Sequence, residues 1–236
     1  MAPEGDNRFV ALRVDRSKPG KELTEYMVAA GGLHSRVLDA LLRVRHQQDP
    51  TLGFRYACRV GMCGSCAMMI NGRERLACQT SISELGGTIT LAPLRSLPVQ
   101  RDLVVDMAPF FDTFRRVKAA LIPEKPDLQE IRKLPPGSRH RSTIERQNGC
   151  ITCGACFSAC EWTRRRKRYL GPAATNRVFM LMLDDKDRLK GARLASVCDD
   201  DSALRCHTSG DCSVVCPVEV PLHTGLQRLR GMIAKG

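Results

Sequence analysis

Twelve cysteines constrain this chain more than any other feature of its sequence. All but Cys198 fall into three spaced groups. Secreted disulfide scaffolds are usually short and follow an apolar signal sequence, whereas this chain of 236 residues begins at Met1 without such a segment. We therefore expect reduced thiols in a reducing compartment, and the spacing of each group indicates what its thiols bind.

The first group has the plant-type ferredoxin spacing and consists of Cys58, Cys63, Cys66 and Cys78. In that pattern a short loop gives three thiolates to a [2Fe–2S] cluster and a later strand gives the fourth. Gly61 and Gly64 would let the loop backbone come close to the cluster. A zinc site is the main alternative and a disulfide pair a remote one, but zinc sites usually use paired Cys-x2-Cys units. The spacing therefore predicts a [2Fe–2S] cluster.

The second and third groups are two runs that each end with a three-residue gap before the last cysteine. The first run matches bacterial two-cluster ferredoxins and contains Cys150, Cys153, Cys156 and Cys160. The second run contains Cys206, Cys212 and Cys216, followed by Pro217. In two-cluster ferredoxins the last cysteine of each run binds the other cluster. This rule predicts one [4Fe–4S] cluster on Cys150, Cys153, Cys156 and Cys216.

The remaining site has only three cysteines, which are Cys160, Cys206 and Cys212. A complete run would need a fourth cysteine at position 209, where the sequence has Ser209. A cubane cluster without a ligand at one corner tends to lose that iron, so we predict a [3Fe–4S] cluster. The alternative is a [4Fe–4S] cluster whose fourth iron is held by the Ser209 hydroxyl or by solvent. Cys198 fits neither run and is expected to be a buried small apolar residue.

The rest of the sequence indicates an α+β protein with two domains, at residues 1–105 and 106–236. Residues 9–14 alternate as a strand does, a helix is expected after Ser35, and Asn71-Gly72 predicts a β-hairpin. A further strand is expected at residues 88–91. A helix is expected over residues 103–121, a breaker-rich linker over 122–137, and mostly helices after Gly149.

Charge and hydropathy limit the interactions that we expect. The 37 Lys and Arg against 25 Asp and Glu give a net charge of +12, and the sharpest basic run is Arg164–Arg168. A nucleic-acid-binding metal protein is one interpretation, but 5% aromatic residues without a stacking pattern favour an anionic lipid surface or an acidic partner subunit instead. No apolar stretch reaches the ~20 residues that a membrane-spanning helix needs, so membrane association is expected to be peripheral.

The order of these cysteine groups resembles the iron–sulfur subunits of succinate dehydrogenases and fumarate reductases. The resemblance covers most of the chain and includes residues 38–42, 48–52, 58–68, 76–78, 102–106 and 171–174. It implies a plant-type ferredoxin (β-grasp) domain followed by a helical bacterial-ferredoxin-like domain. No flavin fingerprint or acid/base constellation occurs in the chain, so the dicarboxylate chemistry is expected on another chain.

The resemblance implies that electrons pass between a flavoprotein (FAD) subunit and a membrane quinone through the [2Fe–2S], [4Fe–4S] and [3Fe–4S] clusters. Membrane-anchor subunits would complete the complex, on the cytoplasmic face of a bacterial cell membrane. His207 occupies the family's quinone-side histidine position, and Trp162 is the candidate quinone tryptophan. Trp162 lies closer to Cys160 than the family's tryptophan does, and Glu161 replaces the usual proline. A related reductase with another substrate or acceptor is the alternative.

Overall fold

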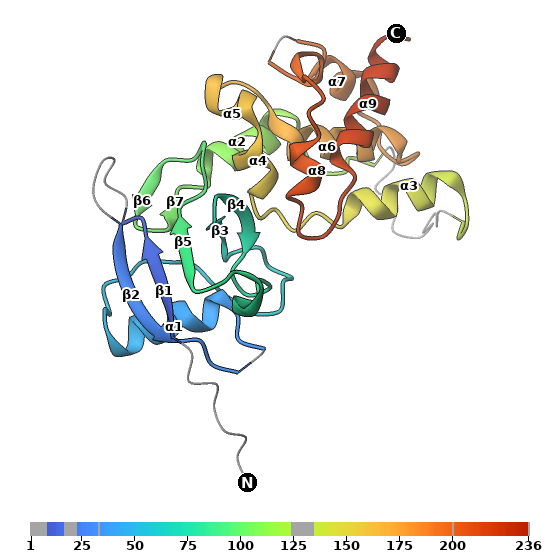
Figure 1. Cartoon of the computed structure of the whole chain (residues 1–236). Coiled ribbons are helices and arrows are strands. Elements are labelled where there is room, and N and C mark those ends of the chain that lie inside the picture. The colour runs from blue at the N-terminus through green and yellow to red at the C-terminus, as the bar shows by residue number, and fades with distance from the viewer. Residues whose placement is uncertain (1–8, 17–22, 33, 124–134, 200, 236) are drawn as a thin grey trace. The chain divides into compact units, whose positions relative to one another are not determined.

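The computed structural model describes residues 9–16, 23–32, 34–123, 135–199 and 201–235 (Figure 1). The chain forms two compact units, one of residues 1–107 with 151–158 and one of residues 108–150 with 159–236. Residues 151–158 thus pack with the N-terminal unit, although they lie in the second of the two domains expected from the sequence. Residues 124–134 of the expected linker lie outside the described part of the chain.

The N-terminal unit contains a five-stranded mixed sheet in the order β2-β1-β5-β3-β4. Its elements are β1 (Phe9–Val14), β2 (Thr24–Ala29), α1 (Val37–Gln47), β3 (Ala67–Ile70), β4 (Arg73–Leu76), the 3-10 turn η1 (Ile82–Glu84) and β5 (Thr88–Ala92). β1 is parallel to β5, and the other neighbouring strands of the sheet are antiparallel. The predicted strands over residues 9–14 and 88–91 are confirmed.

The predicted hairpin is also confirmed, and its geometry follows from the two turn residues. Asn71 and Gly72 both have positive φ, at 48° and 76°. A two-residue hairpin turn requires this conformation if its twist is to match the right-handed twist of the two strands that it joins. Ile70 consequently pairs with Arg73. The hairpin brings Cys66, just before β3, back toward Cys78, just after β4, and Cys78 N–H donates to Cys66 Sγ at 3.5 Å.

Helix α1 packs against the sheet with one apolar face (Figure 1). The predicted core-facing residues Val37, Leu38 and Leu41 are almost fully buried. The helix begins one residue later than expected, because Arg36 and not Ser35 is the N-cap residue. Asp39 accepts a hydrogen bond from Arg36 N–H at 2.9 Å and so satisfies a donor that the helix itself leaves unpaired.

The segment expected to be one long helix over residues 103–121 begins instead with a strand. Strands β6 (Val99–Arg101) and β7 (Val104–Val105) form a short hairpin, and Asp102 between them has φ of 48°. The Asp102 carboxylate accepts from Gly53 N–H at 2.8 Å and from Arg16 at 3.0 and 3.1 Å. These contacts outweigh the local helical tendency, so α2 covers only Ala108–Arg116.

The described part of the second unit is mostly helical, as the sequence indicates after Gly149. Its elements are α2, α3 (Arg139–Asn148), α5 (Glu161–Arg165), α6 (Gly171–Leu183), α7 (Lys190–Ala195), η2 (Ala203–Arg205), α8 (Asp211–Val214) and α9 (Leu222–Ile233). Helix α4 (Ala155–Ala159) lies where the chain passes between the units. Helix α6 is central and packs against α2, α3, α7 and α9. Val178, Phe179 and Leu229 lie in the resulting core.

A buried guanidinium joins the segment after α2 to the segment between α6 and α7. Arg193 and Asp187 are 2% and 3% exposed. The guanidinium donates to both carboxylate oxygens of Asp187, at 2.5 and 2.8 Å, and to three backbone carbonyls, those of Val117, Lys118 and Ala120, at 2.5 to 3.1 Å. Every part of the guanidinium fork therefore has a partner, which is the condition under which a buried charge is tolerated.

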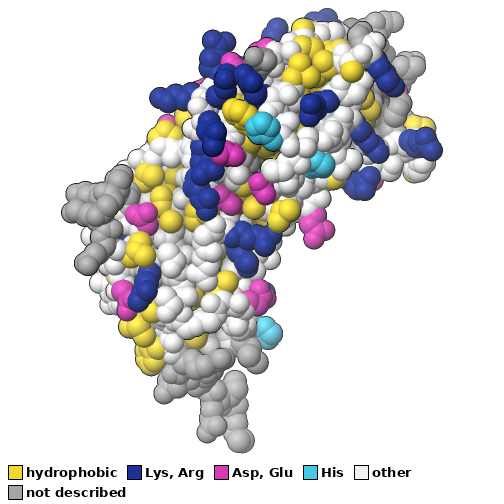
Figure 2. Space-filling view, turned by 45° about the horizontal axis from the view of Figure 1, so that its top comes forward, with side chains coloured by type: hydrophobic (Ala, Val, Ile, Leu, Met, Phe, Trp, Pro, Cys, Tyr) yellow, Lys and Arg dark blue, Asp and Glu magenta, His cyan; other side chains and the backbone are white. Residues whose placement is uncertain are grey.

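Basic residues outnumber acidic ones and give the chain a net charge of +12. Figure 2 shows the Lys and Arg side chains mainly over the upper part of the face in view and few of them over its lower part. Among the described residues, no helix is long and apolar enough to cross a lipid bilayer.

Candidate iron–sulfur sites

The loop between α1 and β3 directs backbone N–H groups at the predicted [2Fe–2S] ligands. Cys58 Sγ accepts from the N–H groups of Met62 and Cys63, both at 3.3 Å, and Cys63 Sγ accepts from Ser65 N–H at 3.5 Å. Such donors stabilise the negative charge of thiolates and cluster sulfides. Within the described residues, no three Cys, His, Asp or Glu side chains converge on a point suited to a single metal ion.

Two cysteines of this group have opposite environments. Hydrogen bonds from Ser65 and from the loop backbone lower the pKa of the Cys63 thiol to about 6. Burial raises the pKa of the Cys66 thiol to about 12. The environment of Cys63 thus favours the thiolate without a bound metal. Cys66, in contrast, needs the positive charge of bound iron to ionise at neutral pH.

Left-handed backbone conformations recur in all three cysteine loops. The first loop has Arg59, Gly61 and Gly64 at positive φ, the second has Thr152 and Gly154, and the third has Thr208 and Gly210. Residues with positive φ turn successive backbone N–H groups to the same side of the chain. The resulting concavities bind anions and are common at Fe–S sites. A left-handed threonine is costly in free energy, so its occurrence in two of the loops fits the binding of an anionic cluster.

The second and third loops also match each other position by position. Thr152 (φ 53°) precedes Cys153, which Gly154 (φ 82°) follows. In the third loop Thr208 (φ 61°) precedes Ser209, which Gly210 (φ 84°) follows. Ser209 therefore occupies, in backbone conformation as well as in spacing, the position that Cys153 has in the second loop.

The first two cysteine loops touch each other within the N-terminal unit. A Cβ atom built on Gly64 would lie 2.6 Å from Cβ of Cys153, and Gly64 has φ of 69°. Both conditions require glycine at this position. A predicted [2Fe–2S] loop residue and a predicted [4Fe–4S] ligand thus lie in direct van der Waals contact.

Each of the four predicted [4Fe–4S] ligands belongs to one of the two compact units. Cys153 and buried Cys156, which is on α4, belong to the N-terminal unit, while Cys150 follows α3 and Cys216 follows α8 in the second unit. Cys216 Sγ accepts from Val220 N–H at 3.3 Å, again the donor that a cluster thiolate needs.

The three remaining cysteines line a single cavity in the helical unit, which has a volume of about 90 Å³. Cys160, Cys206 and Cys212 line it together with Ser209. Burial raises the pKa of Cys160 and raises that of Cys212 to about 12. As with Cys66, ionisation of these thiols needs a bound cation. The structure therefore brings together the residues that the sequence assigned to the third cluster.

The two predicted quinone residues line the same cavity and contact each other. The rings of Trp162 and His207 lie 4.8 Å apart, centroid to centroid. The guanidinium groups of Arg205 and Arg166 lie over the Trp162 ring at 5.6 and 6.0 Å. Trp162 Nε1 is buried and has no hydrogen-bond partner among the described residues, which leaves it able to donate to a ligand.

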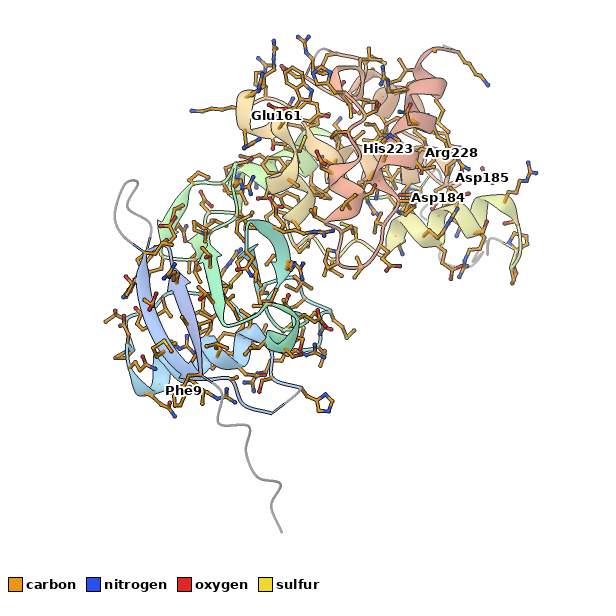
Figure 3. All side chains as sticks on the ribbon, in the orientation of Figure 1. Phe9, Glu161, Asp184, Asp185, His223 and Arg228 are labelled. Carbon is orange, nitrogen blue, oxygen red and sulfur yellow. The ribbon has the colours of Figure 1, made fainter. Side chains whose placement is uncertain are left out.

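Two further residues of this cavity were not predicted from the sequence. Tyr169 is 2% exposed and lines the cavity beside the thiols of Cys160, Cys206 and Cys212; burial and these thiols raise the pKa of its hydroxyl far above the usual value. His223 at the start of α9 also lines the cavity (Figure 3). Neither residue lies in a cysteine run, and the only signal in the sequence is that Tyr169 is the single tyrosine of the helical half.

We expect Tyr169→Phe to lower the reduction potential of the cluster on Cys160, Cys206 and Cys212 by about 50 mV. The change removes a buried hydroxyl beside the cluster thiols, and polar donors near cluster sulfurs favour the more negative, reduced cluster; a loss of about 1 kcal/mol corresponds to about 50 mV for a one-electron couple. Potentiometric titration followed by electron paramagnetic resonance (EPR) measures this shift. Tyr56→Phe, in the other unit, is the control and should leave the potential unchanged.

The prediction that Cys198 is buried is wrong. Its side chain is exposed, and Sγ donates to Leu194 O at 3.0 Å. The residue lies in the turn that follows α7, where the backbone curves toward solvent although the neighbouring Val197 is fully buried.

The arginine run after Cys160 is partly neutralised by acidic residues. Arg165 pairs with Glu161 at 2.6 Å across one turn of α5, and Asp201 lies 3.8 Å from Arg166 and 3.5 Å from Arg168. Glu161, which stands where a proline was expected, thus contributes an ion pair beside the cavity (Figure 3).

The fold and its cysteine loops define a multicluster ferredoxin-type electron-transfer protein. Residues 9–112 match the family model of the 2Fe-2S iron-sulfur cluster binding domain, and residues 146–220 match that of the 4Fe-4S dicluster domain. Mitochondrial succinate dehydrogenase [ubiquinone] iron-sulfur subunit 1 of Oryza sativa subsp. japonica is 35% identical over 212 residues, which cover 89% of this chain and 75% of the relative.

The succinate dehydrogenase iron-sulfur subunit of Paracoccus denitrificans is 34% identical over 226 residues, covering 91% of this chain and 84% of the relative. A chain of the Mycobacterium smegmatis Sdh1 complex in the apo form has the same fold, with a TM-score of 0.87, 29% identity and 97% of each chain covered. This chain belongs to the family of succinate dehydrogenase iron–sulfur subunits. It is the electron-transfer subunit of an oxidoreductase, and the resemblance inferred from its sequence is confirmed.

Proposed function

We propose that this chain carries electrons from a succinate-oxidising flavoprotein subunit to a membrane quinone through [2Fe–2S], [4Fe–4S] and [3Fe–4S] clusters. The observation that carries the proposal is the cavity that combines Cys160, Cys206 and Cys212 with Trp162 and His207. The cluster cysteines and a ligand site with an unpartnered donor thus lie close together, which favours electron transfer from a cluster to a bound acceptor.

The cluster ligands in this proposal are the sets assigned from spacing. Cys58, Cys63, Cys66 and Cys78 would hold the [2Fe–2S] cluster, Cys150, Cys153, Cys156 and Cys216 the [4Fe–4S] cluster, and Cys160, Cys206 and Cys212 the [3Fe–4S] cluster. When bound, these clusters supply one-electron redox chemistry. The chain itself supplies N–H donors to the sulfurs, as at Cys58, Cys206 and Cys216, and excludes water from the buried thiols.

The ligand end of the cavity would orient the quinone. Trp162 Nε1 would donate to a quinone oxygen, since the described residues give it no other acceptor. His207 packs on the Trp162 ring and would carry a proton to or from the second oxygen. The cations of Arg166 and Arg205 above the indole would favour the build-up of negative charge on a quinone during reduction.

The proposed partners follow from the same arrangement. A flavoprotein (FAD) subunit would carry the dicarboxylate site, and membrane-anchor subunits would hold this chain peripherally at the cytoplasmic face of a bacterial membrane. The basic surface suits an anionic lipid face or acidic partner subunits, and a role in nucleic-acid binding is not part of the proposal.

EPR of the anaerobically purified complex tests the proposal. The oxidised sample should show a sharp [3Fe–4S] signal that succinate abolishes, while a [2Fe–2S] signal grows on reduction. An oxidised sample without a signal, whose clusters respond only to dithionite, would instead favour a related reductase with another substrate or acceptor.

Replacing the predicted quinone-binding residues should impair the reaction with quinone and leave the reduction of the clusters by succinate intact. We expect His207→Ala and Trp162→Phe to lower succinate–quinone turnover about tenfold or more, the usual contribution of a positioned proton donor or acceptor, with succinate reduction of the clusters unchanged. His34→Ala, in the N-terminal unit, is the matched control. Equal turnover in all variants would remove the quinone role of these residues.

A further inference from the structure

A second and larger hollow lies on the helical unit, between α3, α6 and α9, and no part of the proposed electron path uses it. Its volume is about 780 Å³, within the ~300–1,000 Å³ typical of small-molecule sites. Four cations line this groove, namely Arg139, Arg146, Arg228 and Lys235. Two come from α3, one from α9, and Lys235 follows α9; Figure 3 shows Arg228 on α9. We call this space the basic groove.

The four side chains of the basic groove make no ion pair or hydrogen bond with any side chain in the described part of the chain. The acidic residues after α6 are engaged elsewhere. Asp185 pairs with Lys190 at 3.8 Å, and Asp184 accepts from Lys186 N–H at 3.0 Å. Glu145 of α3 is not among the residues lining the groove. Positive charges gathered without a counterion among the described residues repel one another, so this groove is suited to a bound anion.

This pattern differs from that of the basic run Arg164–Arg168. The run is prominent in the sequence, yet Glu161 and Asp201 partly neutralise it. The cations of the basic groove come from two segments that are far apart in the sequence, α3 and the end of the chain around α9, and the fold brings these segments together. Solubility alone does not require four cations to gather around the basic groove, because charges spread over the surface serve it equally well.

The remaining lining of the groove indicates the class of anion. Arginine forks match the oxygens of phosphate groups. Arg139 and Thr143 are in the first turns of α3, whose N-terminus carries the positive end of the helix dipole. The half-buried side chains of Leu183 and Met232 provide an apolar wall, and the fully buried Phe179 lies beneath it. The combination fits a multiply charged phosphate group attached to an apolar portion.

We propose that the basic groove binds a phosphate ester, either a soluble one such as a nucleotide or the head group of an anionic lipid. The phosphate lies among Arg139, Arg146, Arg228 and Lys235, and the ester portion lies against Leu183 and Met232. This inference is independent of the quinone cavity and of the identity of the dicarboxylate.

Isothermal titration of the cluster-loaded full chain, with any subunits that co-purify, tests the site. The probes are inorganic pyrophosphate, ATP and a soluble short-chain phosphatidic acid. We expect saturable binding of pyrophosphate that weakens with added salt. The variant Arg146→Ala/Arg228→Ala should weaken it about tenfold or more, because two charge-assisted contacts are lost. ATP binding tighter than pyrophosphate would identify a soluble ester, and tighter binding of the phosphatidic acid would identify a lipid.

The matched control is Arg141→Ala/Arg188→Ala, which removes the same charge from exposed positions outside the groove. Its affinity for pyrophosphate should stay within about twofold of the parent, as expected for residues that make no direct contact. Absence of saturable binding for all three probes would overturn the proposal. An equal loss in the control variant would also overturn it, because binding would then depend on net charge and not on this groove.

Discussion

Replacing Ser209 with cysteine is expected to convert the terminal cluster to [4Fe–4S]. Ser209 has the place in the third loop that Cys153 has in the second, with a left-handed threonine before it and a left-handed glycine after it. It lines the cavity with Cys160, Cys206 and Cys212. A thiolate there would complete the ligand set of a cubane. The sharp EPR signal of the oxidised protein should disappear, a cubane signal should appear on reduction, and iron content should rise by one atom per chain.

The variant Ser209→Ala separates this prediction from its alternative. If the serine hydroxyl held a fourth iron, removing it would change the cluster type, whereas a three-iron site should remain as it is. An unchanged cluster in Ser209→Cys would contradict the assignment. Cys198→Ser is a further control, because that thiol is exposed and outside the cavity, and its iron content should equal that of the parent.

Replacing Arg193 with methionine should produce the largest loss of stability, about 3–5 kcal/mol in the free energy of unfolding, the cost of breaking a buried ion pair by removing one partner. The change leaves the Asp187 carboxylate and three backbone carbonyls buried without their donor. Urea unfolding of the full chain, followed by circular dichroism, measures the loss. Arg188→Met, at an exposed position of the same segment, should change the free energy by less than about 0.5 kcal/mol.

Two additional measurements identify the cause of that loss. Removing both charges in Arg193→Met/Asp187→Leu should recover part of the stability, because no unpaired charge remains buried. Burial alone would raise the pKa of Asp187, but hydrogen bonds from Arg193 and Ile122 N–H outweigh it and lower the pKa. The pair therefore stabilises the fold above the unfolded pKa of about 3.9 and loses this contribution as the pH falls below it. Arg193→Met should flatten that acid dependence.

The sequence predicts those features that depend on nearby residues. Cysteine spacing, the Asn71-Gly72 turn and the alternation of β1 are local patterns, and each has its expected counterpart in the structure. The errors arise where distant contacts decide. Residues 103–107 are not helical because Asp102 is held by Gly53 and Arg16. Tyr169 could not be placed beside Cys206 from the sequence, since the fold of the helical unit alone brings them together.

The partition of the chain into units has a consequence for how the protein is made. Ser158 Oγ hydrogen-bonds to the buried carboxylate of Glu74 and to Arg95 N–H, both at 2.8 Å, and Cys153 lies against Gly64. Residues 151–158 must therefore be synthesised before these contacts of the first unit can form, and the residues of the second unit that precede them are made first. The contacts that complete the first unit thus have a high sequence separation, and contacts of this kind form slowly.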